Sequence, residues 1–128
     1  FIYKIYMQIT KFFFHLINLV FLIFYLYPGS ILGFLLYGNF SKQPQVTPDF
    51  YFSSNHVYAF IVLTLFGLIS HIKKKNIIIY FIFMSIFLEL SHLVIPNRSF
   101  QFSDLFGNIL GVLISILIIK IYNKVEKK

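Results

Sequence analysis

The stretch "KKKNIIIYFIFMSIFLELSHLVIP", residues 73–96, decides the fold class of this chain. Three lysines are followed by a long apolar run that ends at Pro96. The hydrocarbon layer of a bilayer is roughly 30 Å thick, so a crossing helix needs about 20 mostly apolar residues. We therefore interpret residues 77–95 as a membrane span with a basic turn before it.

The composition of the whole chain agrees with this interpretation. The 128 residues are 59% hydrophobic and 12% charged, and they include 18 phenylalanines and nine tyrosines. Such a chain has too little polar surface to cover a soluble globule, and its length suffices for one domain over residues 1–128. Because it has no cysteine, disulfides, thiolate catalysis and cysteine metal sites are excluded. The sequence predicts an all-α integral membrane protein.

Three further apolar runs complete a predicted bundle of about four transmembrane helices. The expected spans are about 8–27, 56–72 and 105–121, in addition to 77–95. A Pro-Gly pair ends the first span. The following apolar piece, 31–38, is too short to cross alone, so we expect an interfacial segment or the kinked end of the first helix. Residues from about 41 to 54 form the main polar loop.

The basic residues predict the orientation of the bundle. With four spans, nine of the 11 lysines and arginines lie on one side, and Lys42 and Arg98 lie on the other. The positive-inside rule then places both termini in the cytoplasm and the 41–54 loop outside. Lysines that gather at the ends and in one tight loop do not indicate a nucleic-acid partner. Because no small-residue cleavage site follows the first apolar run, we expect an uncleaved anchor helix.

This topology gathers polar side chains at the outer ends of the last three spans. These candidate site residues are His56, Glu89, His92, Arg98, Asp104 and Asn108. Glu89 and His92 are one helical turn apart on the same face. In the last span, Asp104 and Asn108 continue into a stripe of small residues, which favours close approach of a neighbouring helix.

Glu89 is the costliest of these residues to place in a membrane. It lies six residues before Ile95, and therefore about 9 Å below the outer end of its helix. An unpaired charge at the centre of a membrane helix costs on the order of 3 kcal/mol even on the lenient insertion scale. We therefore expect Glu89 to be protonated or paired with Arg98, His92 or His56.

The spacing of these residues resembles a known family signature. The pattern of the VanZ-like family, small bacterial membrane proteins named for a teicoplanin-resistance determinant, runs approximately Glu-x-x-Gln, Pro-x-Arg and Asp-x-x-x-Asn-x-x-Gly, after an earlier His. The matching residues here are His56 in "NHVYAF", Glu89, Pro96, Arg98, Asp104, Asn108 and Gly111. The resemblance spans roughly residues 56–112.

Two positions depart from the family pattern. His92 stands where the family commonly has Gln, and the Asp-Lys pair usual shortly before the His is absent near Phe52 and Ser53. The resemblance implies a multi-span protein of the bacterial cytoplasmic (inner) membrane, linked in its founding member to glycopeptide resistance, with no agreed biochemical activity.

Three functional hypotheses follow. The leading one is a non-enzymatic protein that binds an envelope lipid or a lipid-linked precursor at the outer leaflet through the polar residues. The second is an enzyme acting on such a lipid, with Glu89 or His56 as the acid/base. The third is a purely structural cluster in a protein that acts through partner proteins.

We expect no metal or other cofactor from the sequence. Glu-x-x-His is only half of a di-metal bundle motif. A mononuclear site made from His56, Glu89, His92 and Asp104 is conceivable by ligand type, but their spacing does not match an established motif.

Overall fold

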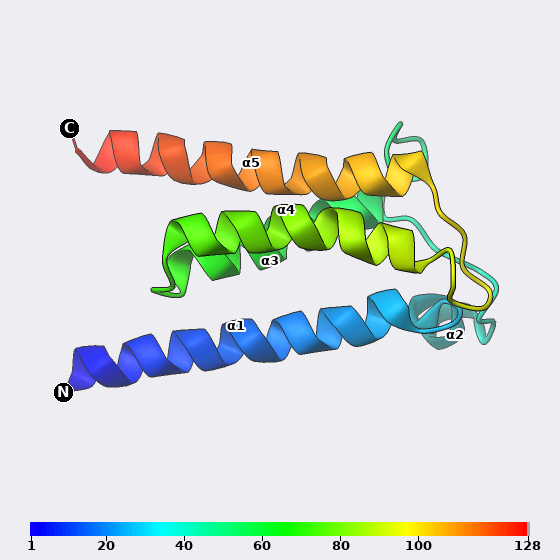
Figure 1. Cartoon of the computed structure of the whole chain (residues 1–128), viewed down its shortest axis with the longest axis horizontal. Coiled ribbons are helices and arrows are strands. Elements are labelled where there is room, and N and C mark those ends of the chain that lie inside the picture. Colours follow the sequence, from blue (N-terminus) through cyan, green and yellow to red (C-terminus); the bar gives the residue numbers. More distant parts are fainter. Residues whose placement is uncertain (128) are drawn as a thin grey trace.

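The computed structural model describes residues 1–127 and confirms the all-helical fold (Figure 1). It has five helices and no strand within that range. The helices are α1 (Ile2–Leu26), α2 (Ile31–Tyr37), α3 (Ser54–Ile69), α4 (Lys74–Ser91) and α5 (Phe102–Glu126).

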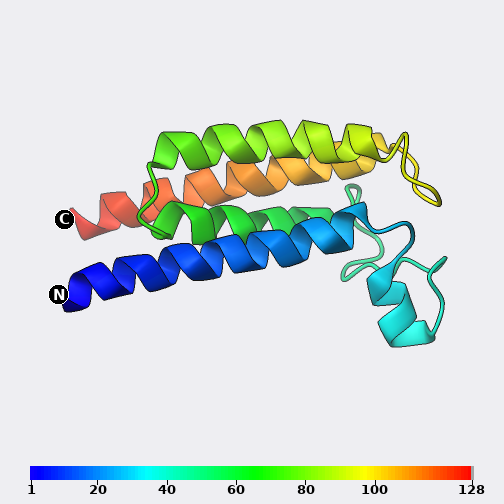
Figure 2. The ribbon, with the colours of Figure 1, turned by 60° about the horizontal axis from the view of Figure 1, so that its bottom comes forward.

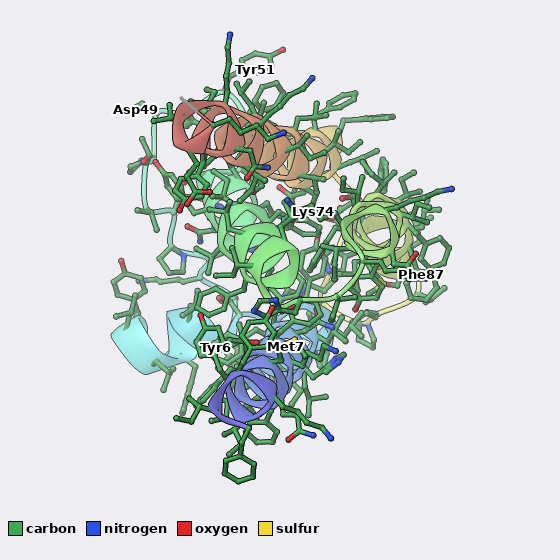
Figure 3. All side chains as sticks on the ribbon, turned by 90° about the vertical axis from the view of Figure 1, so that its left-hand side faces the viewer. Tyr6, Met7, Asp49, Tyr51, Lys74 and Phe87 are labelled. Carbon is green, nitrogen blue, oxygen red and sulfur yellow. The ribbon has the colours of Figure 1, made fainter. Side chains whose placement is uncertain are left out.

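The four long helices lie side by side, with both termini and the α3–α4 turn at one end of the bundle (Figures 1 and 2). The short α2 and the long connections lie at the other end. Seen from the end that holds the termini, α3 lies between α1 and α5, and α4 flanks it (Figure 3). Helix α3 contacts all three of the other long helices.

Two of the helices, α1 and α5, are long and apolar enough to cross a membrane, with mean window hydropathies of 1.9 and 2.2. The 16 residues of α3 rise only about 24 Å. The 18 residues of α4 begin with two lysines and contain Glu89. The four-span bundle therefore stays a prediction, whereas two candidate spans are found.

Helices α1 and α5 extend beyond the expected spans, and α3 ends three residues earlier than expected. Two other differences affect the end of the bundle that holds the polar residues. Helix α4 ends at Ser91, and the chain continues through turns stabilised by bonds such as Leu93 N–H to the Leu90 carbonyl, 3.1 Å. Residues 31–37 form a helix of their own rather than the end of α1, because Gly29, with φ of +127°, turns the chain between them. The side chain of Ser30 caps this short helix by accepting from Gly33 N–H at 2.9 Å.

Small residues bring α5 against α3, which confirms that the stripe on α5 faces another helix. A Cβ added to Gly111 would lie 2.6 Å from the Val57 carbonyl oxygen. One turn further, the Ser115 hydroxyl donates to the Ile61 carbonyl across the same interface at 3.1 Å. Below this contact, the aromatic rings of Phe14, Phe60 and Phe81 fill the core between α1, α3 and α4.

Candidate functional site

The ends of four helices bring a group of polar side chains together inside the bundle, at the end opposite the termini. We call this group the polar cluster: Tyr25, His56, Glu89, His92, Asp104 and Asn108. All six are buried, and Glu89 and Asn108 have exposed fractions of 0%. Five of the six candidates from the sequence are therefore brought together, and Tyr25 joins them from α1.

The Tyr25 hydroxyl is the centre of the polar cluster. It donates to Glu89 Oε2 at 2.8 Å, accepts from Asn108 Nδ2 at 2.8 Å, and lies 3.0 Å from His56 Nδ1. One oxygen atom of α1 thus contacts side chains of α3, α4 and α5. Sequence reasoning missed this residue, because a tyrosine near the end of an apolar span is typical of an aromatic belt at the membrane interface.

The amide of Asn108 fixes the protonation of the His56 ring. Its Nδ2 atom lies 3.3 Å from the Ser85 carbonyl, which only accepts hydrogen bonds, so the amide nitrogen belongs on that side. The Asn108 Oδ1 atom therefore faces His56 Nδ1 at 2.9 Å. Because Oδ1 also only accepts, Nδ1 carries the proton.

Glu89 is the most completely bonded acid of the polar cluster. In addition to the Tyr25 hydroxyl, it accepts from the Gln101 backbone N–H at 2.8 Å. His92 Nδ1 lies 3.4 Å from Glu89 Oε2. Of the three partners expected for Glu89 from the sequence, His92 is therefore the one that pairs with it.

His92 also locks α4 onto α1. Its Nε2 atom lies 3.0 Å from the Tyr25 carbonyl, which requires a proton on that nitrogen. Its ring stacks on the Tyr25 ring with centroids 4.8 Å apart and planes inclined by 18°. His92 thus holds Tyr25 by both its backbone and its ring.

Asp104 is bonded much less completely than Glu89. Its Oδ2 atom lies 3.5 Å from His56 Nε2, and its Oδ1 atom accepts from the Ser103 hydroxyl at 3.4 Å. Within residues 1–127, no hydrogen bond reaches Oδ2. The edge of the polar cluster between His56 and Asp104 is therefore the under-bonded one.

Arg98 lies beside the polar cluster and is not bonded to it. Its Nε donates to the Tyr27 carbonyl at 3.0 Å and its Nη2 donates to the Phe24 carbonyl at 3.1 Å. A cation is favourable against the free carbonyls at the C-terminal end of a helix. Partial burial lowers the pKa of Arg98 from its ordinary value, yet a guanidinium stays protonated at neutral pH.

Two cavities meet at Arg98. The first, about 440 Å³, lies between α1 and α3 and is mostly apolar. Its polar lining includes Tyr25, His56, His92 and Arg98. Its apolar lining includes Ile17, Val20, Phe21, Phe24, Ile31, Leu32, Ala59, Val62 and Leu63.

The second cavity, about 610 Å³, lies at the α1–α2 connection and is lined by more polar groups, including Asn39, Ser41 and Asn97. Ser30, Gln43 and Arg98 border both cavities.

Replacing Tyr25 with phenylalanine should lower the free energy of unfolding by about 1–3 kcal/mol, because Glu89 loses a donor and Asn108 loses an acceptor in a buried site. Urea titration in detergent micelles measures the effect. Tyr27→Phe is the matched control, since no hydrogen bond of the Tyr27 hydroxyl is found in the described chain. Equal stabilities of the two variants would contradict the central role of the Tyr25 hydroxyl.

The comparisons with known proteins bear on the whole chain. No curated protein and no solved structure matches it. The model of the VanZ/LLP1 family matches residues 3–123. This range includes every residue of the polar cluster and both cavities, and the chain therefore belongs to the VanZ/LLP1 family.

Proposed function

We propose that this protein crosses the bilayer with its four long helices and binds a lipid with an anionic headgroup, such as a lipid-linked envelope precursor, at the outer leaflet. One observation carries the proposal: the mostly apolar cavity between α1 and α3 is also lined by Tyr25, His56, His92 and Arg98, and it shares Arg98 with a more polar cavity. An amphiphile has the same two-part character.

The exposed surface supports placement in a membrane. In the most apolar 18-residue stretch of each helix, only 11% of the residues of α1 and 28% of those of α5 are buried inside the protein. The core helix of a soluble protein is mostly buried. Large apolar side chains are exposed along both helices, including Phe12, Leu19, Ile23, Leu113, Leu117 and Ile121. Contiguous exposed apolar surface of this kind is typical of contact with lipid.

The ends of the bundle support an orientation with both termini in the cytoplasm. The triple lysine, of which Lys73 precedes α4 and Lys74 and Lys75 begin it, lies at the same end as the termini (Figure 1). The positive-inside rule places basic residues on the cytoplasmic side. The polar cluster, Arg98 and both cavities then lie toward the outer leaflet. In a bacterial cytoplasmic membrane, lipid-linked cell-wall precursors are displayed on that side.

The apolar cavity fits a hydrocarbon chain. Its volume of about 440 Å³ falls within the usual range of about 300–1,000 Å³ for small-molecule sites. Most of its lining residues belong to α1 and α3, two of the four helices that the proposal places in the membrane. A lipid chain entering between them exchanges bilayer contacts for protein contacts of similar polarity.

Arg98 is the group best placed for the headgroup. Two of its five N–H donors bind the carbonyls of Phe24 and Tyr27, which leaves three available. Arg98 borders both cavities. A lipid whose anionic headgroup binds Arg98 can therefore place its hydrocarbon chain in the apolar cavity. Arginine binds phosphate groups through paired, charge-assisted hydrogen bonds.

Replacing Arg98 with glutamine should weaken binding of undecaprenyl phosphate by roughly tenfold or more, since a hydrogen bond to a charged group contributes about 1.5–3 kcal/mol. Binding to the purified protein in nanodiscs is measured with a fluorescent analogue, and circular dichroism checks the helical content. Lys42→Gln is the control, because it removes a cation of the outer loop that lines neither cavity. A folded Arg98→Gln variant with wild-type affinity would refute the proposal.

The second candidate is an enzyme acting on such a lipid. It is favoured by the position of His56 on the wall of the apolar cavity, whereas Glu89 does not line it. Between the two acid/base residues named from the sequence, His56 is therefore the one that a bound lipid reaches directly. Mass spectrometry of undecaprenyl phosphate and diphosphate after incubation with the protein distinguishes turnover from simple binding.

A further inference from the structure

The two histidine–carboxylate pairs of the polar cluster differ in a way that the lipid proposal does not explain. The histidine–carboxylate separations are similar, 3.4 Å for His92 and Glu89 and 3.5 Å for His56 and Asp104. The two carboxylates differ, because Glu89 accepts two hydrogen bonds of 2.8 Å whereas Asp104 accepts one of 3.4 Å within the described residues. We infer that His56, Glu89 and Asp104 form a binding site for a divalent transition-metal ion with the ligand preferences of zinc.

The protonation of His56 supplies the first step. Asn108 holds the proton on Nδ1, so the neutral ring presents the lone pair of Nε2 toward Asp104. Histidines that bind metals almost always donate their other ring N–H to an oxygen acceptor, which fixes the tautomer and the ring orientation. Asn108 Oδ1 provides that acceptor here.

The distance between His56 Nε2 and Asp104 Oδ2 supplies the second step. A charge-assisted N–H···O bond closes to about 2.7–2.9 Å, and the observed separation is 3.5 Å. Two ligand atoms that each lie about 2.1 Å from one zinc ion, at a tetrahedral angle, are about 3.4 Å apart. The gap therefore has the width of a pair of metal ligands.

Glu89 supplies the third ligand. One ligand atom from each of His56, Glu89 and Asp104 lies within 4.8 Å of the other two. A tetrahedral site with bonds of about 2.1 Å requires closer spacing, so the three side chains would have to approach one another when the ion binds. One imidazole and two carboxylates suit zinc, cobalt and manganese by ligand type.

Charge balance favours the same assignment. Glu89 and Asp104 are both buried, and the guanidinium of Arg98 is directed at the carbonyls of α1 instead. His92 faces Glu89, so with His56 neutral it is Asp104 that has no cation beside it in the polar cluster, and a divalent ion supplies one. The side chain of Asp104 keeps an exposed fraction of 12%, which gives the ion a route from the outer face.

Cobalt titration of the purified full chain in detergent, after treatment with EDTA, tests the inference. We expect visible absorption bands of low-symmetry Co²⁺ that saturate at about one ion per chain and are displaced by zinc, as a single site with protein ligands requires. Asp104→Asn should weaken binding at least tenfold. Asp49→Asn and His15→Gln are the matched controls, because both residues lie outside the cluster and both are exposed.

Two results would contradict the metal site. A wild-type protein with full helical content that gives no cobalt bands at millimolar metal overturns the inference, and so does equal weakening by Asp104→Asn and Asp49→Asn. His56 and Asp104 then form an ordinary ion pair. The outcome is independent of the lipid proposal, because Arg98→Gln should leave cobalt binding unchanged while it weakens binding of undecaprenyl phosphate.

Discussion

Replacing Glu89 with alanine is expected to lower the free energy of unfolding by about 3–5 kcal/mol, the usual effect of removing one member of a buried charged pair. Glu89 has an exposed fraction of 0%, and it accepts from the Tyr25 hydroxyl and the Gln101 N–H while facing His92. Each of these three groups loses its contact with the carboxylate in a buried site. Thermal and urea unfolding in detergent micelles measure the loss.

Glu126→Ala is the control for this substitution, because the Glu126 side chain is exposed and bonds only the Tyr122 hydroxyl within the described residues. A Glu89→Ala variant as stable as Glu126→Ala would mean that the polar cluster contributes little to the fold.

The milder Glu89→Gln variant separates a structural role from a binding role. It keeps one acceptor oxygen and removes the charge. If it unfolds, the cluster acts mainly as a structural link, whereas a folded variant that loses lipid or metal binding assigns the carboxylate to a site.

The position of Glu89 could be predicted from the sequence because a membrane helix leaves few places for a charge. An acid inside an apolar run must have partners in neighbouring helices, and helical periodicity places His92 on the same face. The stripe of Asn108, Gly111 and Ser115 was predictable for the same reason, since small residues mark close helix contacts.

Tyr25 could not be predicted in this way. It is 31 positions from His56 and 64 positions from Glu89 along the chain. Its meaning depends on how α1 packs against α3 and α4, and nothing in the periodicity of α1 specifies that rotation. Tyrosines are also frequent at membrane interfaces without any bonded role.

Arg98 shows a related limit. Opposite charges in a short stretch of sequence favour an ion pair between Arg98 and Glu89, which is one of the pairings expected from the sequence. The Pro28–Gly29 turn instead leaves carbonyls of Phe24 and Tyr27 exposed at the end of α1, and the loop after α4 carries Arg98 to them. The geometry of two separate chain turns decides this contact.

The departure of His92 from the common glutamine of the family has a physical account. A glutamine at this position can also donate to the Tyr25 carbonyl. It cannot stack on the Tyr25 ring as the imidazole does. His92 therefore makes a hydrogen bond that a glutamine could also make, and it adds an aromatic contact with Tyr25 of α1.

Valine in place of Gly111 is expected to lower the free energy of unfolding by up to about 3 kcal/mol, the upper part of the range for overpacked cores. An added Cβ meets the Val57 carbonyl oxygen at 2.6 Å and Phe60 Cβ at 2.7 Å. Neither atom is the end of a flexible side chain, so α5 must move away from α3. The better helix propensity of valine offsets less than about 1 kcal/mol.

The same movement should disturb the polar cluster, because Asn108 and Gly111 lie one turn apart on the face of α5 that packs against α3. Separation of the two helices lengthens the hydrogen bond between Asn108 and His56. The His56 tautomer on which metal binding depends is then no longer fixed. Gly111→Val should therefore weaken both cobalt and lipid binding. Leu113→Phe adds bulk to an exposed position of α5 and should change neither; equal effects of the two variants would show that the α3–α5 contact does not hold the site.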